Sequence, residues 1–189
     1  MKNLLAKVVA PFAVMLALGG QPAVAESKSN IHFALGGFSP LNEAVKDFYS
    51  GGFAGGSMGV DIRLSDYFRW SSDLSAFTRT EEVDGVERTM NYLQLEPIIQ
   101  VVGKDNNGIL YAGFGPSYNQ IQEKATNGKE EAEGTADCWG VVGKIGAEFL
   151  SRTSPWGGFA EFSFRNATRE DVKFGGTSIV VGAKYFFDK

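Results

Sequence analysis

The chain has 189 residues, the length of a single domain, and its 22 acidic and 18 basic residues give a formal net charge of −4. The negative charge argues against general nucleic-acid binding, and a mean hydropathy of −0.11 is too low for a helical membrane protein. Glycine and phenylalanine are frequent, with 24 and 15 residues, which is typical of closely packed, curved strands with aromatic girdles.

The start of the chain is predicted to be a secretory targeting segment. Two lysines precede an apolar run over residues 8–18, and a small-residue A-x-A cleavage site ends at Ala25. The apolar run is too short to span a membrane as a helix. We therefore expect a signal peptide, residues 1–25, followed by one domain, residues 26–189.

Eight segments follow in which apolar and polar residues alternate with the period of two that is typical of a β-strand. In chain order they cover residues 31–38, 53–64, 69–80, 89–102, 109–122, 138–150, 156–166 and 177–187. Two of them are irregular. Pro97 lies inside the fourth segment, where it removes a ladder hydrogen bond and predicts a bulge or a local break. In the fifth segment Gly113, Gly115 and Pro116 leave the phase of the alternation ambiguous.

The charged residues in the clear segments fall on one face only. A narrow barrel that is filled by its own side chains can bury such a nearly neutral set as a paired network. The opposite face carries no Lys, Arg, Asp or Glu, as contact with hydrocarbon requires. The predicted interior network consists of Asp61, Arg63, Arg69, Asp73, Glu96, Lys144, Glu148, Glu161, Arg165 and Lys184, and Arg79 lies on the same face of its segment.

The connections between the segments alternate in length. Those at residues 39–52, 81–88, 123–137 and 167–173 are long, and those at residues 65–68, 103–108 and 151–155 are short. Long outer loops and short periplasmic turns are typical of outer-membrane barrels. The sequence therefore predicts an all-β fold, an eight-stranded antiparallel up-and-down transmembrane β-barrel in the outer membrane.

The eight segments and the end of the chain resemble the small outer-membrane β-barrel domain family, the OmpA-, OmpX- and opacity-protein-like barrels. Gly182, Tyr185 and Phe187 match the Gly-x-x-aromatic-x-aromatic part of that family's insertion signal. The resemblance implies recognition by the outer-membrane barrel assembly machinery and a location, in contact with lipid, in the outer membrane of a Gram-negative-type cell. The chain departs from the pattern at Val180, where a polar residue is usual, and in its two residues after the last aromatic.

No residue pattern indicates catalysis, a cofactor or a metal site. His32 is the only histidine, and we interpret it as a hydrogen-bonded interior side chain rather than an acyl-transfer base. Cys138 is the only cysteine, so it cannot form an intramolecular disulfide, and we expect it to be buried and inert. The acidic clusters in residues 81–88 and 123–137 lack the spacing of a calcium loop.

The sequence thus favours a non-enzymatic outer-membrane protein. Its expected role is structural in the envelope, or a surface interaction through four extracellular loops, with loops 39–52 and 123–137 as candidate sites for an external ligand. A filled interior allows at most low-conductance, porin-like leakage. Two alternatives remain open at this point: a secreted soluble calycin-like barrel that binds a small apolar ligand, and a lipid A-modifying barrel enzyme that acts through His32.

Overall fold

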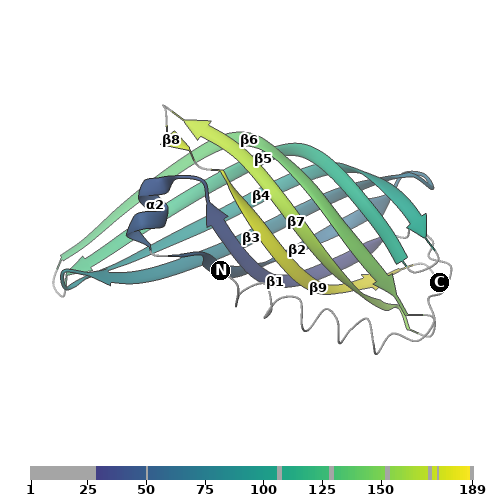
Figure 1. Ribbon diagram of the computed structural model, residues 1–189, viewed down its shortest axis with the longest axis horizontal. Helices are drawn as coiled ribbons and strands as arrows, with labels where there is room; N and C mark the ends of the chain where they lie inside the picture. The colour runs from purple at the N-terminus through teal and green to yellow at the C-terminus, as the bar shows by residue number, and fades with distance from the viewer. Residues whose placement is uncertain are drawn as a thin grey trace.

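Long antiparallel strands curl into a closed barrel whose strands are strongly tilted (Figure 1). The computed structural model describes residues 29–49, 51–105, 108–127, 130–151, 154–169, 172–173 and 175–187. The predicted signal peptide lies outside these residues, as do the last two residues of the chain. Within the described part of the chain, no helix has the length and apolar character needed to cross a membrane.

The barrel wall consists of eight strands, which are neighbours in the order in which they follow along the chain. The structure also contains a two-residue strand, β8, which pairs with the end of β7, and a six-residue helix, α2, between β1 and β2. The bounds are β1 (Asn30–Pro40), α2 (Glu43–Phe48), β2 (Phe53–Arg63), β3 (Phe68–Val83), β4 (Val86–Asp105), β5 (Gly108–Asn127), β6 (Glu130–Leu150), β7 (Trp156–Arg169), β8 (Val172–Lys173) and β9 (Gly176–Phe186).

The barrel closes because the last strand pairs with the first. β9 is hydrogen-bonded to β7 on one side and to β1 on the other, where Phe33 lies opposite Ala183. Every other neighbouring pair is also antiparallel, and β6 pairs with β7. The structure therefore confirms the predicted eight-stranded antiparallel up-and-down barrel.

The alternation seen in the sequence separates the two faces of the wall. Outward side chains such as Leu35, Phe114 and Trp139 are 74%, 77% and 67% exposed, whereas the neighbouring inward side chains are mostly buried. The phase of β5 is now clear, since its buried residues are odd-numbered from Ile109 to Ile121 and its exposed ones even-numbered. The barrel thus has an apolar outside and a polar inside.

Pro97 interrupts the ladder between β4 and β5 without shifting it. Pairing reaches Leu95↔Tyr118 and resumes at Ile99↔Phe114, which is the same register. In that register Pro97 lies opposite Pro116, and neither residue has an N–H to donate. Because both prolines occupy one rung, the predicted local break is present but the wall needs no bulge.

Two segments predicted to be loops are strands. β3 and β4 continue to a turn at Asp84 and Gly85, whose φ angles of 55° and 76° are typical of a two-residue type I′ hairpin. β5 and β6 likewise stay paired out to Asn127↔Glu130. The prediction of loops at residues 81–88 and 123–137 was therefore wrong, because their charged residues occupy paired strands.

These hairpins project beyond the rest of the barrel at one end (Figure 1). β2 pairs with β3 only as far as Thr78, and β7 pairs with β6 only from Gly140, so β3–β6 continue without those neighbours. We call residues 79–90 and 123–137 the outer extension. It forms an open, four-stranded sheet above the closed wall.

Candidate functional site

Charged side chains from six strands, together with His32 of a seventh, meet in one buried network at the middle of the barrel. Nine of the ten predicted members belong to it, and eight of these nine are nearly inaccessible to solvent, Glu161 being half-buried. They form two clusters, which we call the inner and the outer cluster. The inner cluster contains Asp61, Arg69, Glu148 and Lys184, and the outer cluster contains Asp73, Glu96, Lys144, Glu161 and Arg165.

Cations and carboxylates alternate in the inner cluster. Lys184 Nζ lies 2.7 Å from both Asp61 Oδ2 and Glu148 Oε1. Arg69 reaches the same two carboxylates, at 2.6 Å from Glu148 and 3.5 Å from Asp61. With two positive and two negative side chains, this cluster balances its own charge, which is the condition for burying ions at tolerable cost.

Lys144 is the centre of the outer cluster. Its ammonium lies 2.5 Å from Asp73, 3.0 Å from Glu96 and 3.2 Å from Glu161. Arg165 binds both carboxylate oxygens of Glu96 and also donates to the hydroxyl groups of two serines, Ser163 and Ser178. Tyr111 donates a further hydrogen bond, of 2.9 Å, to Glu161. This cluster holds three carboxylates and two cations.

His32 joins the two clusters. Its Nε2 lies 2.6 Å from Asp73 of the outer cluster, and its Nδ1 lies 3.8 Å from Asp61 of the inner cluster. The ring also makes an edge contact with Phe159, at 5.4 Å between centroids. Its recorded neighbours are therefore carboxylates and an aromatic ring rather than a hydroxyl nucleophile, and the geometry fits a structural histidine.

Two arginines that the sequence placed on the charged face lie outside this network. Arg63 is exposed at the end of β2 and pairs with Asp66 of the following turn. Arg79 is half-exposed in the outer extension and pairs with Glu81. Both side chains fall on the inward side of the strand alternation. They lie beyond the middle of the barrel, however, where no opposite wall encloses them. The prediction that Arg63 belongs to the interior network was therefore wrong.

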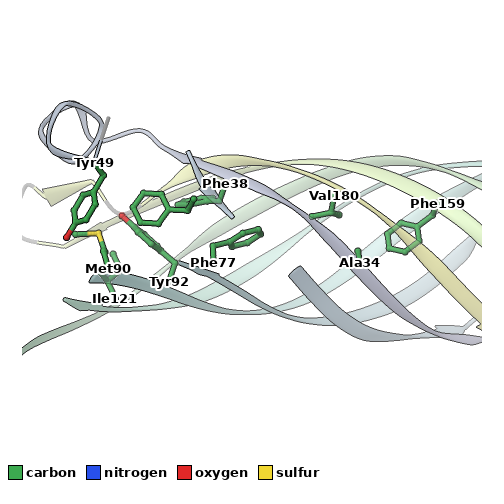
Figure 2. Close-up of a cluster of buried hydrophobic side chains, with 10 residues drawn as sticks. Ala34, Phe38, Tyr49, Phe77, Met90, Tyr92, Ile121, Phe159 and Val180 are labelled. Atoms are coloured by element: carbon green, nitrogen blue, oxygen red, sulfur yellow. The ribbon is translucent and has the colours of Figure 1, made fainter. Parts of the chain in front are cut away.

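Aromatic rings fill the interior on the side of the outer extension (Figure 2). We call this cluster the outer plug, and it consists of Phe38, Tyr49, Phe53, Phe77 and Tyr92. The Phe38 ring lies 4.8 Å from Tyr92 and 5.5 Å from Phe77, and Tyr49 adds a contact of 5.6 Å to Phe53. Each of these rings is at most 2% exposed, so the plug closes the outer mouth.

The helix α2 fastens the plug to the outer extension. Asn42 caps the helix by accepting a hydrogen bond from the backbone N–H of Val45. Just after the helix, the Tyr49 hydroxyl donates to Glu123 at 3.2 Å, and Arg88 both pairs with Glu123 and lies over the Phe48 ring. Burial and then the Glu123 carboxylate raise the pKa of Tyr49.

Apolar side chains from β4, β5 and β6 pack together at the inner end of the barrel. Val102, Ile109 and Tyr111 are buried together, with Leu150 packed against them. Among the described residues, buried side chains thus lie at three levels of the interior: apolar, charged, then aromatic. Within the described ranges no group of His, Cys, Asp and Glu is arranged to hold a metal ion.

Sequence reasoning missed the outer plug and α2. The available signal was Asn42 followed by Glu43, a helix start, with Val45, Phe48 and Tyr49 spaced to share one helical face. The C-terminal residues Gly182, Tyr185 and Phe187 lie on or just after β9, and Gly182 faces the interior next to Phe159, whose ring contacts Lys184. Tyr185 packs between Trp156 and Phe187 at the rim opposite the outer extension.

No protein family model and no curated protein matches this chain. Among solved structures it is similar to Ail of Yersinia pestis, crystallised with the heparin analogue sucrose octasulfate. That match has 14% identity, covers 86% of this chain and 100% of the other, and has a TM-score of 0.57. It is also similar to the outer membrane protein OprG of Pseudomonas aeruginosa, with 11% identity over 87% and 98% of the two chains and a TM-score of 0.59. The chain therefore has the fold of the small eight-stranded outer-membrane β-barrels.

Proposed function

We propose that this chain is a non-enzymatic outer-membrane protein whose barrel anchors an acidic interaction surface outside the cell. The observation that carries this proposal is the outer extension, in which four paired strands project beyond a barrel whose interior is filled. A filled interior supports anchoring rather than transport, and the His32 contacts support a structural rather than a catalytic role.

The outward face of the wall supports a position in a membrane. Large apolar side chains such as Met58, Leu74 and Leu95 are each more than 40% exposed. At the inner rim the rings of Trp156, Tyr185 and Phe187 form a contact chain, as expected of an aromatic girdle at the membrane interface. A soluble calycin-like barrel would instead expose its charged face, and here that face is inside.

The outer extension is suited to binding because it has open edges. In the described part of β6, residues 130–136 pair with β5, and the ladder to β7 on the other side begins only at Gly140. Such an edge can accept an added strand from another protein. Residues 79–90 and 123–137 carry nine acidic and four basic side chains, so a basic partner fits this surface. The Ail structure holds a polyanion, and the acidic charge here favours the opposite preference.

A binding experiment with shortened hairpins tests the proposal. Replacing residues 81–88 and 125–132 each by Asn-Gly would preserve the Thr80↔Thr89 and Lys124↔Glu133 pairs while removing most of the extension. Proteoliposomes of neutral phosphatidylcholine would be incubated with fluorescent poly-lysine or dextran sulfate. We expect salt-sensitive poly-lysine binding to the native chain, severalfold weaker binding to the shortened chain, and little binding of dextran sulfate.

A full-length variant with altered charge distinguishes the effect of the extension's charge from the effect of its shape. Glu131→Lys with Glu133→Lys should abolish poly-lysine binding, and Glu131→Gln with Glu133→Gln should reduce it less. Equal binding by all variants would contradict the proposal. Unboiled and boiled samples on an SDS gel supply the folding control, since a folded barrel migrates differently before heating.

A further inference from the structure

A hollow of about 320 Å³ lies on the outward face of β2–β5, directly below the outer extension. Its outward lining includes Ala54, Ala76, Thr78, Asn91, Gln120 and Gln122. The hollow exists because small side chains meet across strands: Ala54 is opposite Thr78, and Gly56 is opposite Ala76. Gly55 must remain glycine beside it, since a Cβ there would lie 1.9 Å from the backbone oxygen of Ala76.

The strand registers fix the level of the hollow. On its side towards the inner end of the barrel, the next row of outward side chains runs across β2–β6 and is large: Met58, Leu74, Leu95, Tyr118 and Trp139. On its side towards the outer extension, the next outward row runs across β3–β6 and consists of Thr80, Thr89, Lys124 and Glu133. The hollow therefore lies where the apolar belt gives way to the charged outer extension, which is the level of the outer-leaflet interface in the proposed orientation.

We infer that this hollow binds one lipid of the outer leaflet, of the saccharolipid class whose acyl chains carry amide and hydroxyl groups near the sugar. The inference rests on the proposed membrane position, because the hollow then opens only towards lipid. The methyl groups of Ala54 and Ala76 offer space for an acyl chain. Thr78, Asn91 and Gln120 offer neutral donors and acceptors at the point where such a chain joins its headgroup.

The charges around the hollow favour the neutral part of the headgroup over its phosphates. Gln120 faces Asp137 across the β5–β6 ladder, and Gln122 donates a hydrogen bond to Glu133. Lys124 is the cation on the row of Glu133, and its ammonium is already paired with the Glu133 carboxylate at 3.7 Å. A phosphate in the hollow would meet carboxylates, whereas amide and hydroxyl groups would find matching partners.

A matched pair of variants and one double variant separate shape from hydrogen bonding. Ala76→Phe should fill the hollow, and Ala112→Phe is its matched control, because Ala112 is an outward alanine of the same wall that lies between Val101 and Ile145, away from the hollow. The double variant Asn91→Leu with Gln120→Leu should keep the volume but remove the two amides offered to the lipid. The full-length chain is purified from outer membranes in mild detergent, its folded state is checked by unboiled gel mobility, and bound lipid is counted by native mass spectrometry after exposure to lipid A or phosphatidylethanolamine.

We expect the native chain and Ala112→Phe to bind one lipid A in preference to phosphatidylethanolamine. Ala76→Phe should lose this adduct at least tenfold, and the leucine variant should lose the preference for lipid A while still binding lipid. Equal binding by Ala76→Phe and Ala112→Phe, or no preference in the native chain, would overturn the inference. A chain that folds and resides in the membrane but fails this test leaves the proposed function standing, whereas absence from the membrane fraction would remove both.

Discussion

Lys144 holds carboxylates of three different strands within 3.2 Å of one ammonium group. Substitution by methionine keeps most of the volume but removes the ammonium that Asp73, Glu96 and Glu161 share, so that Arg165 is the cation that remains in the outer cluster. Removing one partner of a buried ionic group costs about 3–5 kcal/mol. We expect Lys144→Met to lower the free energy of unfolding by this order, measured by tryptophan fluorescence of the liposome-bound barrel in urea.

A matched control for this experiment is Lys46→Met. Lys46 is a lysine on the exposed side of α2, and its loss should leave the unfolding midpoint nearly unchanged. Equal effects of the two substitutions would show that the buried network contributes little to stability.

His32 connects the two charged clusters, so its substitution should weaken both. His32→Leu removes the 2.6 Å hydrogen bond to Asp73 and leaves a buried carboxylate with one partner fewer. Hydrogen bonds to charged groups contribute about 1.5–3 kcal/mol, and we expect destabilisation of about 2 kcal/mol by the same urea assay. His32→Gln retains a donor and should recover part of that loss. If the lipid A of cells expressing His32→Leu changes relative to cells with the native chain, the structural interpretation of His32 fails.

At the scale of elements, the sequence predicted the barrel wall well because the two faces of a strand are encoded locally. Period-two alternation is enough to assign Glu96 inward and Leu95 outward, whatever their partners are. The contacts of Glu96 with Lys144 and Arg165 could not be predicted, because they depend on closure of the barrel and on its diameter. Arg63 lies on the inward side of the alternation, and the prediction still misplaced it. The alternation of a strand does not tell where along the barrel axis the interior ends.

The outer extension was missed for a related reason. Acidic residues such as Glu81, Glu82 and Glu87 resemble a solvated loop in a sequence, yet cross-strand pairing accommodates them on both faces of an exposed hairpin. Asp84 and Gly85 carried the usable signal, because Asp-Gly is the strongest short hairpin signature. The outer plug needed tertiary information, since its rings come from β1, β2, β3, β4 and the end of α2.

Tyr49 links α2 to the outer extension, and its ionisation should release the helix. Its pKa is raised in the folded protein, so the unfolded state loses the phenol proton first, near the ordinary value of about 10. The stabilisation is therefore complete below about pH 10 and falls as the pH rises above it. We expect thermal stability of the native chain to decline above that pH more steeply than that of Tyr49→Phe, followed by circular dichroism. Parallel declines in the two chains would contradict this role of Tyr49.

At the scale of the whole molecule, three successive layers of buried side chains occupy the barrel, so opening one should not create a channel. Tyr49→Ala weakens the outer plug but leaves the charged clusters and the inner apolar residues in place. We expect planar bilayers containing either the native chain or Tyr49→Ala to show no stable conductance steps. Regular steps from the native chain would refute the filled interior and favour a porin-like role.

The C-terminal residues allow an assembly signal to be distinguished from a structural requirement. Phe187 is 54% exposed beyond the end of β9, so Phe187→Ala should leave refolding into detergent micelles intact while reducing insertion into the outer membrane of cells severalfold.

Gly182 differs, because a Cβ there would lie 2.0 Å from the backbone oxygen of Phe33 and 2.7 Å from the Phe159 ring. Gly182→Ala should therefore impair both refolding and insertion, as read from unboiled gel mobility and membrane fractionation. Tyr185→Ala removes a ring from the rim girdle and should resemble Phe187→Ala if the two aromatics are recognised together. Normal insertion of both aromatic variants would mean that this chain is assembled without the signal that its last residues resemble.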